Sequence, residues 1–340
     1  MRIRGEGSSP HPGIILPRLR LALRDLENPG IVSRMSPPPL QIAREPLAPF
    51  SLSLPLALAL QCWPEAERAM QLEALRQADA KGSSDFLLLA ARRGDDLAGA
   101  ILAQQLPGKT ATLFSPQLVL GEADPSIPLQ LLANAESSLA AAGVHLCQCL
   151  LAKGLPAAPL AAAGYQHSAD LLYMTCEPDH FPAGPPAIPG FKLAPFKDGE
   201  EAALAIVIDE TYVGTQDCPA LNGLRDSLDV VEGYKHVGEF RADLWLTLES
   251  ETNSAAGCLI LAKHPPSSTL ELIYVGVTPA FRQRGLGAKL TRHAQWLAGQ
   301  SNCERLVLAV DAANEPAIAM YAGAGFWAWE ERAIWVKSLA

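Results

Sequence analysis

The stretch from Leu270 to Leu290 constrains the fold of this 340-residue chain more than any other segment. It begins with an apolar run, mostly β-branched or aromatic, that ends at Val277 and is typical of a strand covered on both faces. A turn rich in arginine and glycine follows over Arg282–Gly287, and a helix is expected to begin near its end. Gly285 and Gly287 allow backbone angles that a Cβ forbids, and they let a ligand approach the main chain. Because a helix N-terminus presents unpaired N–H groups, the stretch predicts an anion site, most often for phosphate.

Composition and charge limit the class of protein. A chain of this length suits two domains of about 150 residues each. Its 49% hydrophobic and 19% charged residues are typical of a globular protein with a large core. No run of about 18 uncharged apolar residues occurs, so we expect no membrane partner. The net charge of −9 argues against nucleic acid as a partner, because binding phosphates needs a basic face.

The cysteines favour a reduced, cytoplasmic protein. There are seven of them, an odd number, and they are scattered along the chain. Cys147 and Cys149 lie one residue apart in an apolar run, which suits packing within a strand better than a metal site. No second cluster of Cys or His has zinc spacing, so we expect no metal.

The chain divides into four segments by composition. Residues 1–39 mix Arg, Gly, Ser and Pro without a sustained period, which indicates a disordered tail or an over-long start. Residues 40–178 read as a first α/β domain, and residues 191–340 as a second. Between them, residues 179–190 form a Pro-rich linker, since five prolines fall between Glu177 and Gly190.

Hydrophobic periodicity and turn residues predict strands and helices in both domains. In the first, strands are expected over Ile42–Leu47, Phe86–Ala91, Leu97–Gln104, Thr110–Leu120, His145–Leu151 and Tyr165–Cys176, and helices over Glu65–Ala78, Ile127–Ala142 and Pro156–Ala163. In the second, strands are expected over Phe191–Pro195, Asp243–Leu248, Gly257–Lys263, Leu270–Val277, Arg305–Val310 and Phe326–Val336, and helices over Asp198–Tyr212, Leu224–Tyr234, Gly287–Gly299 and Pro316–Ala324.

The two domains show signs of an internal duplication. The hexapeptide from Leu160 to Tyr165 lies 161 residues before the similar hexapeptide from Tyr321 to Phe326. Each follows a predicted strand and precedes an apolar closing strand. The helix that ends at Ala142 has a counterpart at nearly the same offset.

The motif Arg282-Gln283-Arg284-Gly285-Leu286-Gly287, after Val277-Thr278-Pro279, resembles the signature of the GCN5-related N-acetyltransferase (GNAT) family. That signature is Arg/Gln-x-x-Gly-x-Gly/Ala between the fourth strand and the third helix. The family transfers an acetyl group from acetyl-CoA to an amine, and the resemblance covers about 150 residues. It implies an α/β (α+β) chain of two GNAT-like domains, each a mixed, mostly antiparallel central sheet flanked by helices.

The resemblance also implies where acetyl-CoA binds as co-substrate. The strand residues Val275, Gly276 and Val277 would line the thioester, and the Val277 N–H would donate to its carbonyl oxygen. Such an oxyanion donor often contributes about 3 kcal/mol. Backbone N–H groups of the turn would hold the pyrophosphate; the residues concerned are Arg282, Gln283, Arg284, Gly285, Leu286, Gly287 and Ala288.

A second cluster resembles the family's later motif. Asn314 would contact the pantetheine arm, and Tyr321 would face the sulfur of CoA and protonate the departing thiolate. Seven residues, or two helical turns, separate the two, so both side chains can lie on one side of a helix.

The general base is less defined. Glu271 lies six residues before Val277 on the same strand, where histone-type members of the family carry a Glu. Many other members use a chain of waters instead, so both alternatives stay open. Asp217, in the loop after the first helix of the second domain, could equally bind the substrate amine.

The first domain departs from the family pattern where the signature should be. Between its expected strand and helix stands Gly121-Glu-Ala-Asp-Pro-Ser-Ile-Pro, whose acids repel a pyrophosphate and whose prolines lack N–H donors. At the 161-residue offset, Asn314 corresponds to Lys153 and Tyr321 to Leu160. We expect this copy to be degenerate, with a structural role or a place in one wall of the acceptor cleft.

The sequence therefore predicts an acetyl-CoA-dependent N-acetyltransferase that acetylates an amine of a small molecule or peptide by direct attack in a ternary complex. The alternative is a non-catalytic CoA- or acyl-CoA-binding sensor or scaffold. A dinucleotide-binding oxidoreductase is disfavoured, because its Gly-x-Gly-x-x-Gly motif would need a glycine where Leu290 stands. The acceptor, the length of the acyl group and the oligomeric state stay open.

Overall fold

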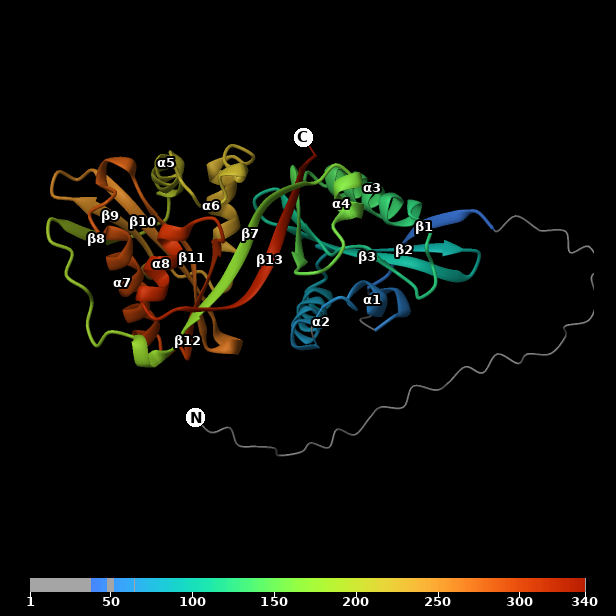
Figure 1. Ribbon diagram of the computed structural model, residues 1–340, viewed down its shortest axis with the longest axis horizontal. Coiled ribbons are helices and arrows are strands. Elements are labelled where there is room, and N and C mark those ends of the chain that lie inside the picture. Colours follow the sequence, from blue (N-terminus) through green and yellow to red (C-terminus); the bar gives the residue numbers. More distant parts are fainter. Residues whose placement is uncertain (1–37, 48–51, 64, 340) are drawn as a thin grey trace, which may run out of the picture. The chain divides into compact units, whose positions relative to one another are not determined.

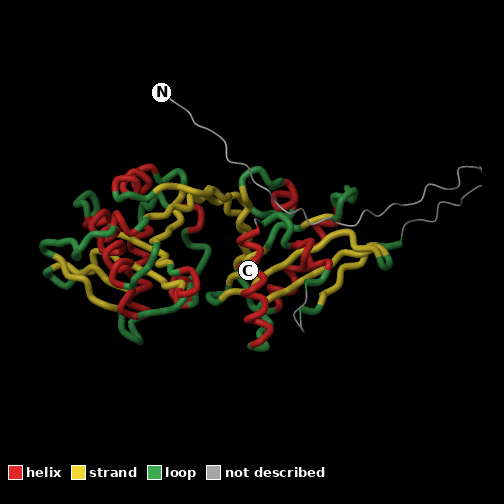
Figure 2. Tube along the Cα trace, turned by 90° about the horizontal axis from the view of Figure 1, so that it is seen from below, coloured by secondary structure: helices red, strands yellow, loops and turns green. Residues whose placement is uncertain are grey.

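The computed structural model describes residues 38–47, 52–63 and 65–339, and residues from Pro39 onward belong to one compact unit. The expectation of a tail over residues 1–39 falls outside the described residues, except at Pro38 and Pro39. The fold is mixed α/β, as predicted, with helices lying against strands in both halves of the unit (Figure 2).

The N-terminal half contains seven strands and four α-helices within the described residues. They are β1 (Leu40–Glu45), α1 (Leu54–Ala59), α2 (Glu65–Ala80), β2 (Phe86–Arg93), β3 (Asp96–Leu106), β4 (Thr110–Leu113), β5 (Gln117–Leu118), α3 (Ser126–Ala141), β6 (Leu146–Ala152), α4 (Ala158–Ala162) and β7 (Gln166–Cys176). The single strand expected over Thr110–Leu120 is two strands, β4 and β5. Pro116 lies between them, and a proline cannot donate to a strand ladder.

The C-terminal half follows the expected order of elements. They are β8 (Phe191–Pro195), α5 (Glu201–Tyr212), α6 (Ser227–Lys235), β9 (Trp245–Ser250), β10 (Ala255–His264), β11 (Thr269–Val277), α7 (Leu286–Gln300), β12 (Arg305–Asp311), α8 (Glu315–Gly323) and β13 (Trp327–Ser338).

One sheet runs through both halves in the order β1-β2-β3-β4-β6-β13-β7-β12-β11-β10-β9-β8, with β5 paired to β3. All its pairings are antiparallel except two, β4 with β6 and β11 with β12. This confirms the mixed, mostly antiparallel sheet that the sequence predicts.

The two closing strands are exchanged between the halves. β7, which ends the N-terminal half, pairs with β12 and β13 of the C-terminal half, and β13 in turn pairs with β6 (Figure 1). Leu171 of β7 pairs with Arg332 of β13, and these two residues are 161 positions apart in the sequence. The predicted repeat thus places equivalent residues of the two copies opposite each other. The domain boundaries at residues 178 and 191 stay predictions, but no sheet boundary coincides with them.

In the C-terminal half, α7 covers one face of the sheet. Gln295 of α7 donates to the Sγ of Cys176 at 3.0 Å, and Cys176 is the register partner of Leu306 on β12. Leu308 and Val310 follow on the same face and are buried. Arg305, Val307 and Ala309 therefore point to the opposite face. Their register neighbours there are Glu271 on β11, Tyr173 and Thr175 on β7, and Trp327 on β13.

We call this second surface the open face, because most of its side chains reach solvent. It is defined by Glu271, Arg305, Val307, Ala309, Tyr173, Thr175, Trp327 and Trp329, all but Thr175 exposed or half-buried.

Candidate functional site

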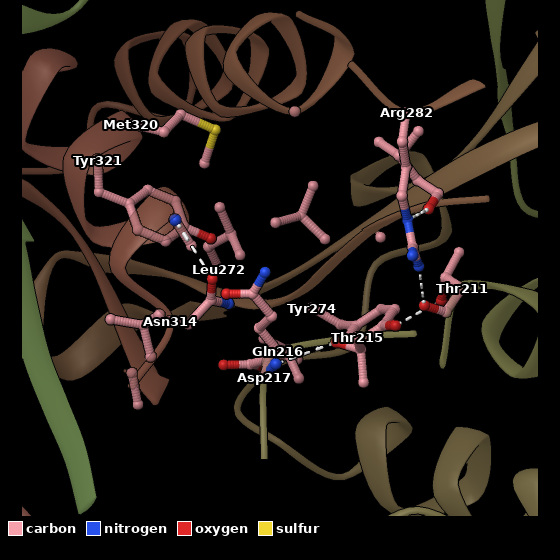
Figure 3. A pocket seen from close by; sticks show the side chains of 18 of the residues that line it. Thr211, Thr215, Gln216, Asp217, Leu272, Tyr274, Arg282, Asn314, Met320 and Tyr321 are labelled. Carbon is pink, nitrogen blue, oxygen red and sulfur yellow. Dashed lines mark hydrogen bonds between the residues drawn. The ribbon is translucent and has the colours of Figure 1, made fainter. Parts of the chain in front are cut away.

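A gap opens between two parallel strands of the C-terminal half. β11 and β12 pair only where Thr269–Glu271 meets Arg305–Val307, and beyond this point both strands continue without pairing to each other. A cavity of about 260 Å³ occupies the divergence. Its walls come from β11, β12, α8, the end of α5 and the loop after it (Figure 3). It is lined by Thr211, Gly214, Thr215, Gln216, Asp217, Leu272, Ile273, Tyr274, Val275, Gly276, Val277, Arg282, Gly287, Ala309, Val310, Asn314, Ala317, Met320 and Tyr321.

The backbone of β11 presents donors to this cavity. The N–H of Thr278 donates to Ala256 O of β10 at 2.9 Å. Because successive N–H groups of a strand point to opposite edges, those of Val277 and Val275 point away from β10, toward the gap. The N–H of Val277, the expected oxyanion donor, therefore points toward the gap between β11 and β12.

Gly276 lies where α5 crosses β11. A Cβ on Gly276 would stand 2.7 Å from the Oγ1 of Thr211, closer than real Cβ atoms approach any atom. The same Thr211 hydroxyl bonds the Tyr274 hydroxyl and donates to Ile208 O at 2.6 Å. Glycine at this position thus lets helix and strand approach closely.

The turn before α7 has the geometry of an anion site. Gln283 and Gly285 both have positive φ, 62° and 70°, with Arg284 between them. Such alternation directs successive N–H groups into one concavity. Gly285 is the N-cap of α7. It has no side chain that could cap the helix, and the first turn carries no acidic residue. The N–H groups at the start of α7, including that of Ala288, are therefore available to a ligand.

Gly287 and Arg282 have structural roles in addition to lining the cavity. A Cβ on Gly287 would stand 3.2 Å from the Sδ of Met320, so glycine here lets α7 approach α8. The guanidinium of Arg282 donates to three carbonyls: Val277 at 3.0 Å, Gly214 at 3.2 Å and Thr211 at 2.7 Å. Arg282 thereby ties the end of α5 to the end of β11. This contact could not be predicted from the sequence.

Tyr321 lies on α8 and Asn314 directly before it, and both line the cavity. Tyr321 is 5% exposed, and burial raises its pKa, with the charge of Asp217 adding to the effect. The hydroxyl therefore keeps its proton at neutral pH and can donate it. Asn314 is the N-cap of α8, and its Oδ1 accepts from the Ala317 N–H at 3.3 Å.

Asp217 supplies the carboxylate of the cavity. Its Oδ1 accepts from the Asp311 N–H at 3.0 Å, and the Cys218 N–H donates back to the Asp311 Oδ2 at 3.0 Å. These two bonds tie the loop after α5 to the end of β12. Burial raises the pKa of Asp217, and the charge of Asp311 acts in the same direction.

Glu271, the expected base, does not line the cavity. It lies on the open face opposite Val307 of β12, and its carboxylate bonds the Nε2 of His264 at 2.7 Å. Its catalytic role stays a prediction. Thr211, Tyr274 and Met320 line the cavity but were not predicted, because each would read equally well as a core residue.

The equivalent region of the N-terminal half is filled by the chain itself. At the start of α3, Asp124 Oδ1 accepts from the Ser126 N–H at 2.9 Å, and Asp124 also bonds Arg93. Glu122 accepts from two further N–H groups, those of Ala123 and Asp124. These contacts put carboxylates where the C-terminal half leaves N–H groups free.

The strand gap of the N-terminal half is filled as well. The cavity beyond β4 and β6 measures only about 10 Å³, and Trp63 lies in its wall, 5.1 Å from the ring of Phe114. Both features favour the prediction that this copy has lost CoA binding.

No group of three or more His, Cys, Asp or Glu among the described residues is placed to hold a metal ion. No helix in the described ranges is long and apolar enough to cross a membrane.

A strand pair that diverges beside an uncapped helix N-terminus, in this strand order, is the arrangement of the GNAT fold. The sequence profile described as the acetyltransferase (GNAT) family matches residues 208–326, which carry the whole site. The match lies within the C-terminal half, and the described residues have the fold of GNAT proteins. No curated protein sequence matches it.

Solved structures show that the tandem fold has precedents. A GCN5-related N-acetyltransferase from Sphaerobacter thermophilus has a TM-score of 0.59 at 15% identity, with 88% of this chain and 96% of that one covered. A tandem GNAT protein from the clavulanic acid biosynthesis pathway has a TM-score of 0.53 at 18% identity, covering 89% and 99%. A region of a fungal β-N-acetylglucosaminidase, described as a glucosamine N-acetyltransferase, has a TM-score of 0.54 at 11% identity, covering 89% and 38%. At these identities the likeness establishes the fold.

Proposed function

We propose that the C-terminal half is an acetyl-CoA-dependent N-acetyltransferase, with its active site in the cavity between β11 and β12. The observation that carries this proposal is the position of Tyr321 and the Val277 N–H in one cavity that adjoins the uncapped start of α7. These groups would supply a donor site, an oxyanion donor and a proton donor within one continuous region.

The residues present fit acetyl-CoA. The free N–H groups from Gly285 to Ala288 suit a pyrophosphate, and the gap between the strands suits an extended pantetheine arm. Asn314 lies at the cavity wall and can hydrogen-bond an amide of that arm. Acetyl-CoA would supply the acetyl thioester.

The chain's own residues would then manage charge and protons during direct attack by the amine. Asp217 holds the acceptor's ammonium, and the Val277 N–H stabilises the oxyanion that forms at the carbonyl. As the C–S bond breaks, Tyr321 donates its proton to the sulfur. Before the attack, the ammonium loses one proton through water toward the open face, where Glu271 and His264 form a pair that can accept it. The second proton, lost by the nitrogen after the attack, restores the Tyr321 hydroxyl through water.

The decisive experiment places a charge at the start of α7. Ala288 is exposed and is the third residue of the helix. Ala288→Glu would put a carboxylate beside the pyrophosphate while leaving the fold intact, since an acid in the first turn stabilises a helix. We expect the Kd for CoA, measured by calorimetry, to rise about tenfold or more, equivalent to about 1.4 kcal/mol.

Ala288→Gln is the matched control, with the same shape and no charge. It should change the Kd by no more than about twofold. If Ala288→Glu binds CoA as the parent chain does, the assigned donor site is wrong. Incubation with acetyl-CoA and a mixture of amines distinguishes the two alternatives: an enzyme releases free thiol, and a CoA-binding sensor does not.

A further inference from the structure

A second, larger cavity lies on the open face of the sheet. Its volume is about 560 Å³, and Glu271 lies one strand away from it, opposite Val307. The lining residues are Thr175, Glu177, Pro178, Glu304, Arg305, Val307, Trp327 and Trp329.

Two tryptophans form one wall of this cavity. Trp327 and Trp329 are each 52% exposed, although large aromatic side chains are usually buried where the core can take them. A bulge in β13 leaves Trp329 without a register partner, between the pairs Ala328–Met174 and Glu330–Tyr173. The ring of Trp329 packs edge-on against Tyr173, with centroids 6.0 Å apart. The bulge and the Tyr173 contact hold an aromatic platform in place, with ring surface left to solvent.

The charges around the platform are mostly negative. The carboxylates of Glu177 and Glu304 line the cavity, against one cation, Arg305. A neutral apolar ligand would remove water from these carboxylates without replacing it, which costs free energy. A cation would instead lie over the indole faces and near the carboxylates, and a flat cation would cover most ring area.

The platform shares a face with the cavity of about 260 Å³ between β11 and β12, which we call the donor cavity. Val307 lines the larger cavity and Ala309 lines the donor cavity, and these two residues point to the same side of β12. Two residues along β12 span about 7 Å. Since β7 lies between β12 and β13, two strand spacings add about 10 Å at right angles to this direction. The platform therefore lies roughly 12 Å from the donor cavity along a continuous surface.

We propose that this cavity binds the far end of the acceptor, and that this end is a flat cation of the guanidinium type, roughly 12 Å from the amine that is acetylated. The inference rests on the proposed function, because it names the acceptor class of the same site. The open face guides the linker between the two ends, and Asp217 receives the reacting ammonium.

Matched pairs of acceptors test the proposal. The probes are α,ω-aminoalkylguanidines of increasing chain length and n-alkylamines of the same lengths, with turnover followed by release of free thiol from acetyl-CoA. We expect the guanidines to show at least a tenfold higher kcat/KM, with an optimum at the chain length that spans roughly 12 Å.

Variants locate the effect. Trp327→Leu and Trp329→Leu should raise KM for the guanidines about tenfold each and leave kcat and the Kd for CoA nearly unchanged. Trp329→Phe keeps an aromatic ring and should restore most of the loss. Glu304→Gln should weaken the preference for guanidines over alkylamines. Both tryptophans are exposed, so these variants should fold.

Outcomes separate this proposal from the proposed function. If CoA binds and amines are acetylated, but the leucine variants treat guanidines and alkylamines as the parent does, the platform proposal is overturned and the function stands. If CoA does not bind, the function fails. The platform is then tested by quenching of tryptophan fluorescence with the same guanidines: loss of the quench in both leucine variants supports it, and an unchanged quench overturns it.

Discussion

Tyr321 and Asp217 reach the same cavity from elements that are far apart in the sequence. The residues on one continuous motif, such as Gly285, could be predicted because their spacing carries the chemistry. Asn314 and Tyr321 were expected because the residues around them resemble a later motif of the GNAT family. The bond between Asp217 and Asp311 could not, since it joins a loop to a strand end 94 residues away. The hydrogen bonds from Arg282 to three carbonyls could not be predicted either, because the sequence does not distinguish this arginine from one that only faces solvent.

Replacing Tyr321 by Phe should lower kcat by about 10²-fold or more, because general-acid catalysis typically contributes that much. The Kd for CoA should change little, since only the hydroxyl is lost from a buried ring. Release of free thiol at saturating acceptor measures the first quantity, and calorimetry the second.

Tyr212→Phe is the control at this site. Its ring packs on Tyr274 outside the cavity, so turnover should stay within about twofold of the parent. Equal turnover in Tyr321→Phe and the parent would remove Tyr321 from the proton transfer.

At the scale of elements, β11 and α5 determine the shape of the donor cavity. The apolar run of β11 predicts the strand, and β11 spans nearly the expected range. The divergence of β11 from β12 could be expected from the resemblance to the GNAT family. It could not be predicted from the local sequence, because the pairing of a strand depends on its neighbours in space. The helix α1 was not predicted. It has only six residues, mostly apolar, and so short an apolar run shows no helical periodicity.

Gly276→Ala should destabilise the contact between β11 and α5. The added methyl would meet Thr211 at 2.7 Å, and overpacking of this kind typically costs about 1–3 kcal/mol. Urea unfolding followed by circular dichroism measures the change. Because Gly276 lines the donor cavity, the affinity for CoA should fall as well.

Gly323→Ala offers a matched comparison on α8. A Cβ there would meet nothing within 4 Å, and its φ is not in the left-handed region. The substitution should be neutral or stabilise the protein by up to about 1 kcal/mol. Equal stability of the Gly276 variant and the parent would show that α5 can shift away from β11 without cost.

For the whole molecule, the internal repeat predicts the arrangement only in part. The 161-residue offset places Leu171 opposite Arg332, but an offset cannot say whether each copy completes its own sheet or its neighbour's. Both β7 and β13 read as closing strands of their own halves. The same ladder of hydrogen bonds is available whether each strand closes its own half or the other half. Tertiary packing, and not local sequence, therefore decides that the strands are exchanged.

The exchange makes the two halves depend on each other. A chain of residues 179–340 lacks β7, so the edge of β12 from Leu306 to Asp311 and β13 from Trp327 to Val336 lose their common partner. An unpaired strand edge next to a buried core is a template for association. We expect this fragment to aggregate or to pair with a second copy, as size-exclusion chromatography with light scattering would show. Expressed together with residues 38–178, it should form a 1:1 complex that binds CoA with the affinity of the whole chain. A monomeric fragment 179–340 that unfolds cooperatively and binds CoA would mean that the C-terminal half closes its own sheet.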